Sequence, residues 1–168
     1  MIKILFSDVD GVWTDDCYYY VDNGAQIRKF STKDSAGLLL LQSFNIQTVI
    51  LSGDDNLASR KRFENLGVLG YYGIKNKGQF IREWAHENKV QLSDIGYVGN
   101  DINDVTVFQL LEITYAPFNS PIYVKKYVKN VFHDHPNPGD GYFRFVVEKY
   151  LESQDKLDQA YERVIRGA

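Results

Sequence analysis

The 168-residue sequence predicts an α/β protein built on a Rossmann-like, doubly wound parallel sheet. Short runs rich in apolar and β-branched residues alternate along the chain with segments of helical periodicity. Polar clusters directly follow three of these runs, beginning at Asp8, Ser52 and Asn100. Doubly wound sheets bind their ligands outside the carboxyl ends of the strands, so the clusters are expected at one sheet edge.

Size and composition favour one compact domain. The chain is 44% hydrophobic and 24% charged, which is enough to bury a core without cross-links. Cys17 is the single cysteine, which excludes an internal disulfide and fits a reducing compartment. We see neither a signal peptide nor a transmembrane segment, and therefore expect a cytoplasmic protein. With a net charge of -3 and only short basic clusters, we expect no binding to nucleic acid or membranes.

The first half of the chain predicts two strands of the sheet and a hairpin between them. The first strand is expected at residues 2–6. Residues 17–21 and 26–30 flank an Asn23-Gly24 pair, which favours a hairpin turn. Ser31 or Thr32 can cap a helix that carries residues 38–41 and Phe44. A strand at residues 48–51 then precedes a helix that reaches about Leu66, and Gly67 is a typical helix end.

The second half repeats the alternation. A short strand is expected at residues 71–72, an amphipathic helix at 78–89 and a strand at 95–98. A helix through Leu111, two short strands at 113–116 and 128–132, and a helix at 141–151 follow. An amphipathic segment at 157–165 is the last element. We therefore expect a core at residues 1–152, with a hairpin insertion at about 17–30, and a helical extension at 153–168.

Asp8 and Asp10 are the most informative residues for function. They lie two residues apart at the end of the first strand, with Gly11 following in a turn. Two like charges at a strand's exit repel unless a cation lies between them, and a divalent metal with oxygen ligands is the usual cation. An aspartate beside a metal can attack a phosphoryl group. Asp8 would then be the nucleophile, and Asp10 the general acid and base.

Further residues supply what phosphoryl transfer needs beside Mg²⁺. Ser52 and backbone N–H groups near it would hold phosphate oxygens, and Lys77 would place a fixed positive charge near Asp8. Asp101 or Asp104 would complete the metal site or orient the lysine. Each residue alone is also typical of a turn or of the surface. Their order and their shared position after strands favour the functional interpretation.

With these residues the chain resembles the haloacid dehalogenase (HAD) superfamily. Its four motifs are matched by Asp8-Val9-Asp10-Gly11-Val12, Leu51-Ser52-Gly53, Lys77 and Gly99-Asn100-Asp101-Ile102-Asn103-Asp104. Residues 8–15, 30–37 and 139–144 more closely resemble the capless 3-deoxy-D-manno-octulosonate 8-phosphate phosphatases and the related 2-keto-3-deoxy-nonulosonate 9-phosphate phosphatases. The resemblance covers about residues 2–151.

This resemblance implies a cytoplasmic, Mg²⁺-dependent phosphatase that forms an aspartyl-phosphate and lacks a large cap domain. Its substrate would be an eight- or nine-carbon 2-keto-3-deoxy acid phosphate, from a pathway to lipopolysaccharide or capsule sugars such as KDO or sialic acid. The resemblance also implies a homotetramer in which the hairpins build a central barrel and neighbouring subunits close each site. The implied metal ligands are Asp8, Asp10, Asn100 and Asp101, with Asp104 in support. The implied substrate-binding residues are Lys33, Asp34, Ser35, Gly53 and Arg144.

The chain departs from this pattern at two positions. The fourth motif usually begins Gly-Asp, and that aspartate ligates the metal, whereas this chain has Asn100. An amide oxygen can ligate Mg²⁺ but contributes no charge, so metal affinity is expected to drop unless Asp101 substitutes. Octulosonate phosphatases also typically carry Gly-Gly-Arg-Gly where this chain has Pro138-Gly139-Asp140-Gly141. The lost cation, at a place where an acidic sugar should bind, weakens the octulosonate assignment and leaves a nonulosonate or another sugar phosphate open.

Two other classes of function compete with the phosphatase. A receiver-type signalling domain also uses carboxylates, a hydroxyl and a lysine, but it places its phospho-acceptor after a later strand. A catalytically weak domain that binds a sugar nucleotidyltransferase would explain Asn100. The retention of Asp8, Asp10, Ser52 and Lys77 argues against that second alternative.

Overall fold

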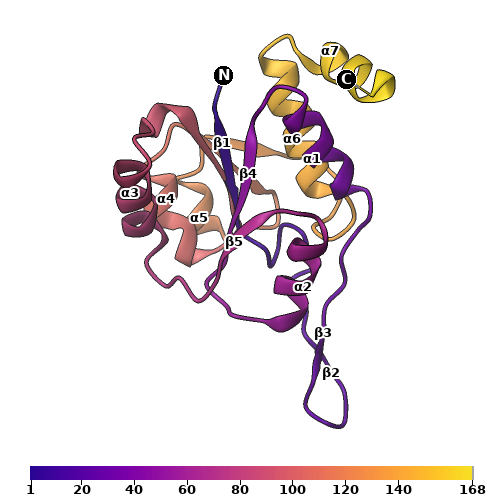
Figure 1. The fold of residues 1–168 in the computed structure, drawn as a ribbon. Helices are drawn as coiled ribbons and strands as arrows, with labels where there is room; N and C mark the ends of the chain where they lie inside the picture. Colours follow the sequence, from indigo (N-terminus) through magenta and orange to yellow (C-terminus); the bar gives the residue numbers. More distant parts are fainter. Residues whose placement is uncertain (168) are drawn as a thin grey trace.

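The computed structural model describes residues 1–167 and contains one six-stranded sheet (Figure 1). All strands of the sheet are parallel, in the order β5-β4-β1-β6-β7-β8. The predicted doubly wound α/β fold is confirmed, and the described residues contain no large cap domain. The strands are β1 (Ile4–Ser7), β4 (Gln47–Leu51), β5 (Leu69–Tyr71), β6 (Ile95–Val98), β7 (Ile113–Pro117) and β8 (Asn130–Phe132).

Helices cover both faces of this sheet (Figure 1). The α-helices are α1 (Asp34–Gln42), α2 (Leu57–Asn65), α3 (Lys77–Glu87), α4 (Val105–Phe108), α5 (Ile122–Lys125), α6 (Tyr142–Ser153) and α7 (Leu157–Arg166). Two 3-10 turns, η1 (Leu92–Asp94) and η2 (Ile102–Asp104), flank β6. Helices α1 and α6 pack together on one face, and α3 and α4 pack together on the other. The core therefore has two apolar layers with the sheet between them.

Strand β1 shows how the sequence builds these two layers. Successive side chains of a strand point to opposite faces. Leu5 therefore packs with the α1 and α6 layer, while Ile4 and Phe6 pack with the α3 and α4 layer. All three side chains are buried, as expected for a central strand covered on both faces.

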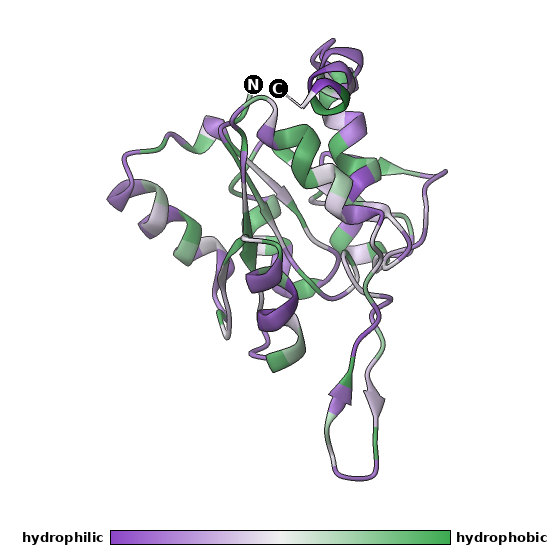
Figure 2. Ribbon diagram, turned by 45° about the vertical axis from the view of Figure 1, so that its right-hand side comes forward, coloured by the Kyte–Doolittle hydropathy of each residue, from purple (hydrophilic) through white to green (hydrophobic). Residues whose placement is uncertain are grey.

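The hairpin of β2 (Tyr19–Tyr20) and β3 (Gln26–Ile27) projects from the body at the end opposite the termini (Figures 1 and 2). The predicted hairpin is confirmed, but each strand has only two residues. An isolated two-stranded ribbon has little to stabilise longer strands. Its exposed apolar side chains are those of Tyr18, Tyr19, Tyr20, Val21 and Ile27.

Several predicted boundaries are wrong. Helix α1 begins at Asp34, and neither Ser31 nor Thr32 caps it; the Ser31 hydroxyl instead accepts the N–H of Lys33, outside the helix. β5 begins two residues and ends one residue earlier than predicted, because its register is set by pairing with β4. The helix after β6 ends at Phe108 rather than at Leu111. The short elements η1 and α5 were not predicted, since single turns have no periodicity to read.

The last helix, α7, packs against α1 and α6 of its own chain. Ala160 is fully buried there, and Leu157, Tyr161 and Val164 are packed against the same layer. The apolar side of the amphipathic segment predicted at residues 157–165 therefore packs against the core of its own chain. In residues 1–167, no helix is both long and apolar enough to cross a membrane.

Candidate active site

Asp8 directly follows β1 at the carboxyl edge of the sheet. β1 is paired with β4 on one side and with β6 on the other, so it lies where the strand order reverses. The backbone N–H of Asp8 donates to the carbonyl of Val98 at 2.8 Å, which extends the β1–β6 pairing by one residue. The backbone of Asp8 is thus fixed at the place where doubly wound sheets bind their ligands.

Lys77, the first residue of α3, contacts Asp8. Its side chain is fully buried, and Nζ lies 2.7 Å from Oδ2 of Asp8 and 2.6 Å from Oδ1 of Asp104. The hydroxyl of Tyr97 accepts from Nζ at 3.2 Å and donates to Asp104 at 2.6 Å. A buried ammonium is stable only when it is paired and hydrogen-bonded, and these groups meet that need.

Burial disfavours charge on both Asp8 and Lys77, but the neighbours alter the outcome. Burial raises the pKa of Asp8 to about 7, and the Lys77 ammonium acts in the opposite direction. Burial lowers the pKa of Lys77, yet the carboxylates of Asp104 and Asp8 outweigh it and hold that pKa above its usual value. Lys77 is therefore a fixed positive charge beside Asp8.

Asp104 ties the lysine to the loop after β6. Its side chain is fully buried, and Oδ2 accepts the backbone N–H of Asn100 at 2.8 Å and of Asp101 at 3.1 Å. One carboxylate therefore holds Lys77 on one oxygen and the acidic loop on the other. This arrangement agrees with a supporting rather than a metal-binding position for Asp104.

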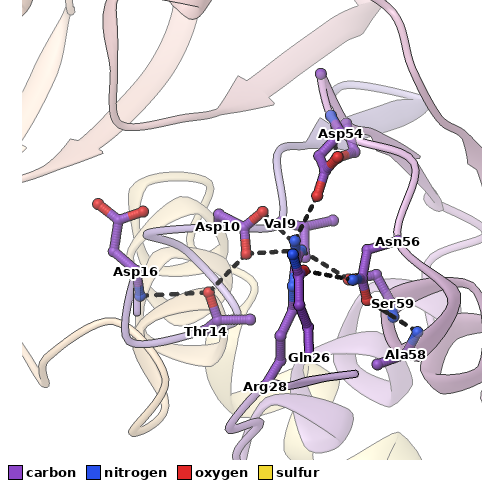
Figure 3. Close-up of polar contacts among 12 residues, drawn as sticks. Val9, Asp10, Thr14, Asp16, Gln26, Arg28, Asp54, Asn56, Ala58 and Ser59 are labelled. Atoms are coloured by element: carbon purple, nitrogen blue, oxygen red, sulfur yellow. Dashed lines mark hydrogen bonds and ion pairs between the residues drawn. The ribbon is translucent and has the colours of Figure 1, made fainter. Parts of the chain in front are cut away.

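Arg28, at the base of the hairpin, holds Asp10 (Figure 3). Its Nη1 lies 2.9 Å from Oδ1 and 2.7 Å from Oδ2 of Asp10, and the hydroxyl of Thr14 donates to Oδ1 at 3.0 Å. Nη2 lies 2.5 Å from Oδ2 of Asp54, and the Arg28 side chain has no exposed surface. Burial raises the pKa of Asp10, and Arg28 is the strongest opposing influence. Arg28 and Thr14 together therefore fix the orientation of the Asp10 carboxylate.

Motif spacing does not identify Arg28 or Tyr97, because neither belongs to a motif. The available signal for Arg28 is strand alternation. Gln26 and Arg28 are two residues apart and both face the body, where Gln26 accepts from the side chain of Asn56 at 2.8 Å (Figure 3). The signal for Tyr97 is a phenol in an otherwise apolar strand, since a buried phenol requires a polar partner.

Ser52 and Gly53 follow β4 at the same edge. Ser52 is buried, and its hydroxyl accepts the N–H of Asp54 at 3.2 Å. Lys75 donates from Nζ to the carbonyl of Gly53 at 2.6 Å. A Cβ on Gly53 would lie 3.1 Å from the side chain of Asn103, so a larger residue would crowd the loop after β6.

Asn100 and Asp101 complete this edge. Asn100 is buried, with its amide packed over Gly11: a Cβ at Gly11 would come within 1.9 Å of Nδ2. Gly11 also has φ +71°, so both space and conformation require glycine there. Asp101 is exposed, and its Oδ1 accepts the N–H of Ile102 at 2.7 Å at the start of η2.

Asp8, Asp10, Ser52, Asn100 and Asp101 line one pocket of about 410 Å³, a size typical of small-molecule sites. Five of the lining residues are aspartates, and Lys75 is the only lysine or arginine among them. The lining residues are Asp8, Asp10, Asp16, Tyr18, Ser52, Gly53, Asp54, Lys75, Asn100, Asp101, Ile102 and Asn103. The excess of carboxylates favours a bound cation.

The donor set fits a hard divalent cation. Among residues 1–167, no three His, Cys, Asp or Glu side chains are arranged to hold a metal by themselves. Mg²⁺ does not need such a cage, because it usually keeps several waters and binds one or two carboxylates together with phosphate. Asp8, Asp10 and either Asn100 or Asp101 could provide the protein oxygens. Burial and the nearby carboxylates of Asp10 and Asp101 raise the pKa of Asp16, as expected where negative charge is concentrated.

Four predicted substrate-binding residues lie apart from this pocket within the chain. Oδ1 of Asp34 accepts the backbone N–H of Arg144 at 3.0 Å, and Ser35 accepts from Arg62 at 3.0 Å. The Arg144 side chain is bonded to Glu148 and Tyr161. Lys33, just before α1, and Arg144, in the first turn of α6, line a second hollow. A substrate-binding role for Lys33, Asp34, Ser35 and Arg144 remains a prediction.

The buried Asp34 carboxyl is unusual in its own right. Its Oδ2 has no hydrogen-bond partner within residues 1–167. Burial raises the pKa of Asp34 to about 6, with the backbone N–H groups of Arg144 and Phe143 acting in the opposite direction. Asp34 therefore joins the start of α1 to the start of α6 at a cost in charge burial.

Fold and site together define a hydrolase of the HAD class. An aspartate stands after the first strand of a parallel sheet, beside a buried lysine and an oxygen-rich loop from the neighbouring strand. A carboxylate held in this way is a suitable nucleophile for a phosphoryl group.

No protein-family model matches the chain. Individual relatives and solved structures, however, agree with this class. The 3-deoxy-D-manno-octulosonate 8-phosphate phosphatase KdsC of Haemophilus influenzae is 33% identical over 156 residues, covering 92% of this chain and 86% of that protein. A cobalt-bound structure of the H. influenzae phosphatase superposes with a TM-score of 0.85 at 31% identity, covering 95% and 96% of the two chains. The Yersinia pestis phosphatase of the same name gives a TM-score of 0.85 at 26% identity, covering 94% and 84%.

The chain therefore belongs to the 3-deoxy-D-manno-octulosonate 8-phosphate phosphatase family of the HAD superfamily. It is a phosphoric monoester hydrolase. Family membership does not support the receiver-domain hypothesis or the partner-protein hypothesis.

Proposed function

We propose that this chain is a Mg²⁺-dependent phosphatase that hydrolyses an eight- or nine-carbon 2-keto-3-deoxy acid phosphate through an aspartyl-phosphate. The observation that carries the proposal is the 2.7 Å contact between Asp8 and the buried Lys77 at the point where the strand order reverses. A carboxylate held there beside a fixed positive charge suits attack on a negatively charged phosphoryl group.

In the first step, a carboxylate oxygen of Asp8 attacks phosphorus while the bond from phosphorus to the sugar oxygen breaks. Asp10 gives its proton to the departing oxygen, which leaves as the sugar hydroxyl. Lys77 offsets the negative charge that gathers around Asp8. Ser52 and the backbone N–H groups of its loop hold the phosphoryl oxygens.

In the second step, Asp10 accepts a proton from water, which attacks the phosphorus of the aspartyl-phosphate. Inorganic phosphate leaves and Asp8 is again a free carboxylate. The Thr14 and Arg28 contacts keep the oxygens of Asp10 in one orientation through both proton transfers.

Asp8, Asp10 and Asn100 or Asp101 would hold the metal, which when bound supplies charge neutralisation between the Asp8 carboxylate and the phosphate dianion. The cobalt-bound H. influenzae relative supports a divalent cation in this family. Magnesium suits the hard oxygen donors of the pocket.

For the substrate class, the proposal relies on relatives that are named for an octulosonate phosphate. Asp140 occupies the position at which octulosonate phosphatases typically carry an arginine, and its carboxylate pairs with Lys29 at 2.8 Å. We therefore leave the nine-carbon acids in the substrate class. We also propose that four chains assemble through their hairpins, which would bring Lys33, Asp34, Ser35 and Arg144 toward a neighbour's site.

The proposal is tested by phosphate release from a panel of sugar phosphates in the presence of Mg²⁺. Eight- and nine-carbon keto-acid phosphates are expected to give the highest kcat/KM, with neutral hexose phosphates as comparison. Asp8→Asn is expected to abolish release, while Asp158→Asn, an exposed change on α7, is expected to leave it unchanged. Turnover of no phosphate ester, or turnover that survives Asp8→Asn, would refute the proposal.

A further inference from the structure

The orientation of the Asn100 amide decides whether Asn100 can serve a cation, because only its oxygen can ligate a metal. β1 and β6 leave the sheet side by side, with Ser7 paired to Val98, so Asn100 emerges next to Asp8 and Asp10. Nδ2 is the Asn100 atom nearest to a Cβ built on Gly11, and it lies 3.4 Å from Oδ2 of Asp16. The amide nitrogen therefore faces Gly11 and Asp16, and the oxygen faces away from them.

Asp16 is held in place for this contact. It has φ +64°, in the left-handed region, and its backbone N–H donates to the hydroxyl of Thr14 at 3.3 Å (Figure 3). The same hydroxyl donates to Asp10, so Thr14 sets the positions of both acids. Asp16 lines the pocket, and within residues 1–167 its carboxylate has no lysine or arginine in ion-pair contact.

We propose that Asp16 is a positioning residue for the metal site. Its carboxylate accepts from Nδ2 of Asn100 and thereby turns the amide oxygen toward the cation. The inference rests on the proposed function, because it concerns the same cation. It accounts for how this chain could retain metal affinity with an asparagine at the head of its fourth motif.

The contact between Asp16 and Asn100 matters because it selects one orientation of the amide, not because the hydrogen bond is strong. At 3.4 Å it is a long hydrogen bond and contributes little on its own. The opposite amide orientation, however, would bring the Asn100 oxygen to the same distance from the Asp16 carboxylate, where two acceptors repel. Partners that orient a metal ligand typically alter metal affinity by about 10–100-fold when they are removed.

The test is Mg²⁺ affinity measured by titration calorimetry, without substrate. Asp16→Asn suits the test because asparagine tolerates the left-handed region and the fold is kept. We expect it to weaken Mg²⁺ binding about tenfold. The matched control is Asp15→Asn: it removes the same charge one residue away, where the carboxylate bonds to the Tyr19 hydroxyl at 2.7 Å and does not line the pocket.

A double-mutant cycle with Asn100→Asp tests whether Asp16 affects Mg²⁺ binding through the Asn100 amide. A carboxylate at position 100 has oxygens at both ends and needs no orientation, so Asp16→Asn is expected to cost little in that background. An equal loss in both backgrounds would overturn the proposal, because Asp16 would then act independently of Asn100. Equal affinities of Asp16→Asn and Asp15→Asn would overturn it as well. Absence of Mg²⁺ binding by the unaltered chain would instead refute the metal dependence of the proposed function, and this inference with it.

Discussion

Nη1 of Arg28 lies 2.9 Å and 2.7 Å from the two carboxylate oxygens of Asp10. Asp10 belongs to the loop after β1, and Arg28 follows β3 at the base of the hairpin. This ion pair ties the projecting hairpin to the group that we assign as general acid and base. Conformational disturbance of the hairpin is therefore expected to reach the active site through Arg28.

Arg28→Ala is expected to lower kcat for phosphate release by about tenfold or more, because it frees the Asp10 carboxylate and removes the cation beside it. Arg28→Lys keeps the charge but cannot contact Asp10 and Asp54 with the same fork, so it should restore only part of kcat. Lys29→Ala is the matched control, since Lys29 pairs with Asp140 at an exposed position. If Arg28→Ala and Lys29→Ala had equal kcat values, Arg28 would have no role in positioning Asp10.

Lys77→Met should lower the free energy of unfolding by about 3–5 kcal/mol, because it leaves the buried carboxylates of Asp8 and Asp104 without a counter-charge. Urea unfolding at pH 7 measures this. Lys75→Met removes the same charge from an exposed side chain and is expected to change stability by less than about 0.5 kcal/mol. Similar losses for the two variants would contradict the buried ion-pair account.

Asp34 predicts a dependence of stability on pH. The pKa of Asp34 is about 6 in the folded protein, against 3.8 as its ordinary value, so the folded state binds this proton more tightly than the unfolded state does. The corresponding stability is present in full below about pH 4 and is lost as the pH rises to about 6. The loss is on the order of 3 kcal/mol.

Asp34→Asn keeps an acceptor for the Arg144 N–H but carries no titrating proton. Relative to the unaltered protein, its free energy of unfolding should therefore rise between pH 4 and pH 7, as measured by urea unfolding at each pH. A difference between the two proteins that stayed the same at both pH values would show that the buried Asp34 does not titrate in this range.

Much of the fold follows from local pattern. The strand β6 was predicted at its observed bounds, Ile95–Val98, because its apolar run stands between turns and is buried on both faces. The predicted cap of α1 was wrong. Asp34 at the start of α1 accepts the N–H of Arg144 in α6, and such a tertiary hydrogen bond cannot be predicted from the neighbouring sequence.

The site likewise contains residues that local sequence predicts and residues that it does not. Asp8 and Ser52 directly follow β1 and β4, Asn100 lies two residues after β6, and Lys77 is the first residue of α3. Their places in the chain topology therefore bring them to one edge of the sheet. Arg28 and Asp16 reach that edge through the hairpin and its entry loop, whose path depends on contacts distant in sequence. Such contributions become visible only when the chain is folded.

Asn100→Asp provides a separate test of the metal ligands. An aspartate there would add a charged ligand, so calorimetry should show tighter Mg²⁺ binding than in the unaltered protein. Unchanged affinity would indicate that Asp101 is the third protein ligand. Asp101→Asn should then weaken binding strongly.

The central claim is that Asp8 itself becomes phosphorylated. Its most direct test is mass spectrometry of the enzyme after rapid acid quenching during turnover of a keto-acid sugar phosphate with Mg²⁺. We predict one phosphoryl group on the peptide that contains Asp8, and none in Asp8→Asn. Steady turnover with Asp8 never phosphorylated, when the same quench preserves a chemically prepared aspartyl-phosphate, would contradict the account.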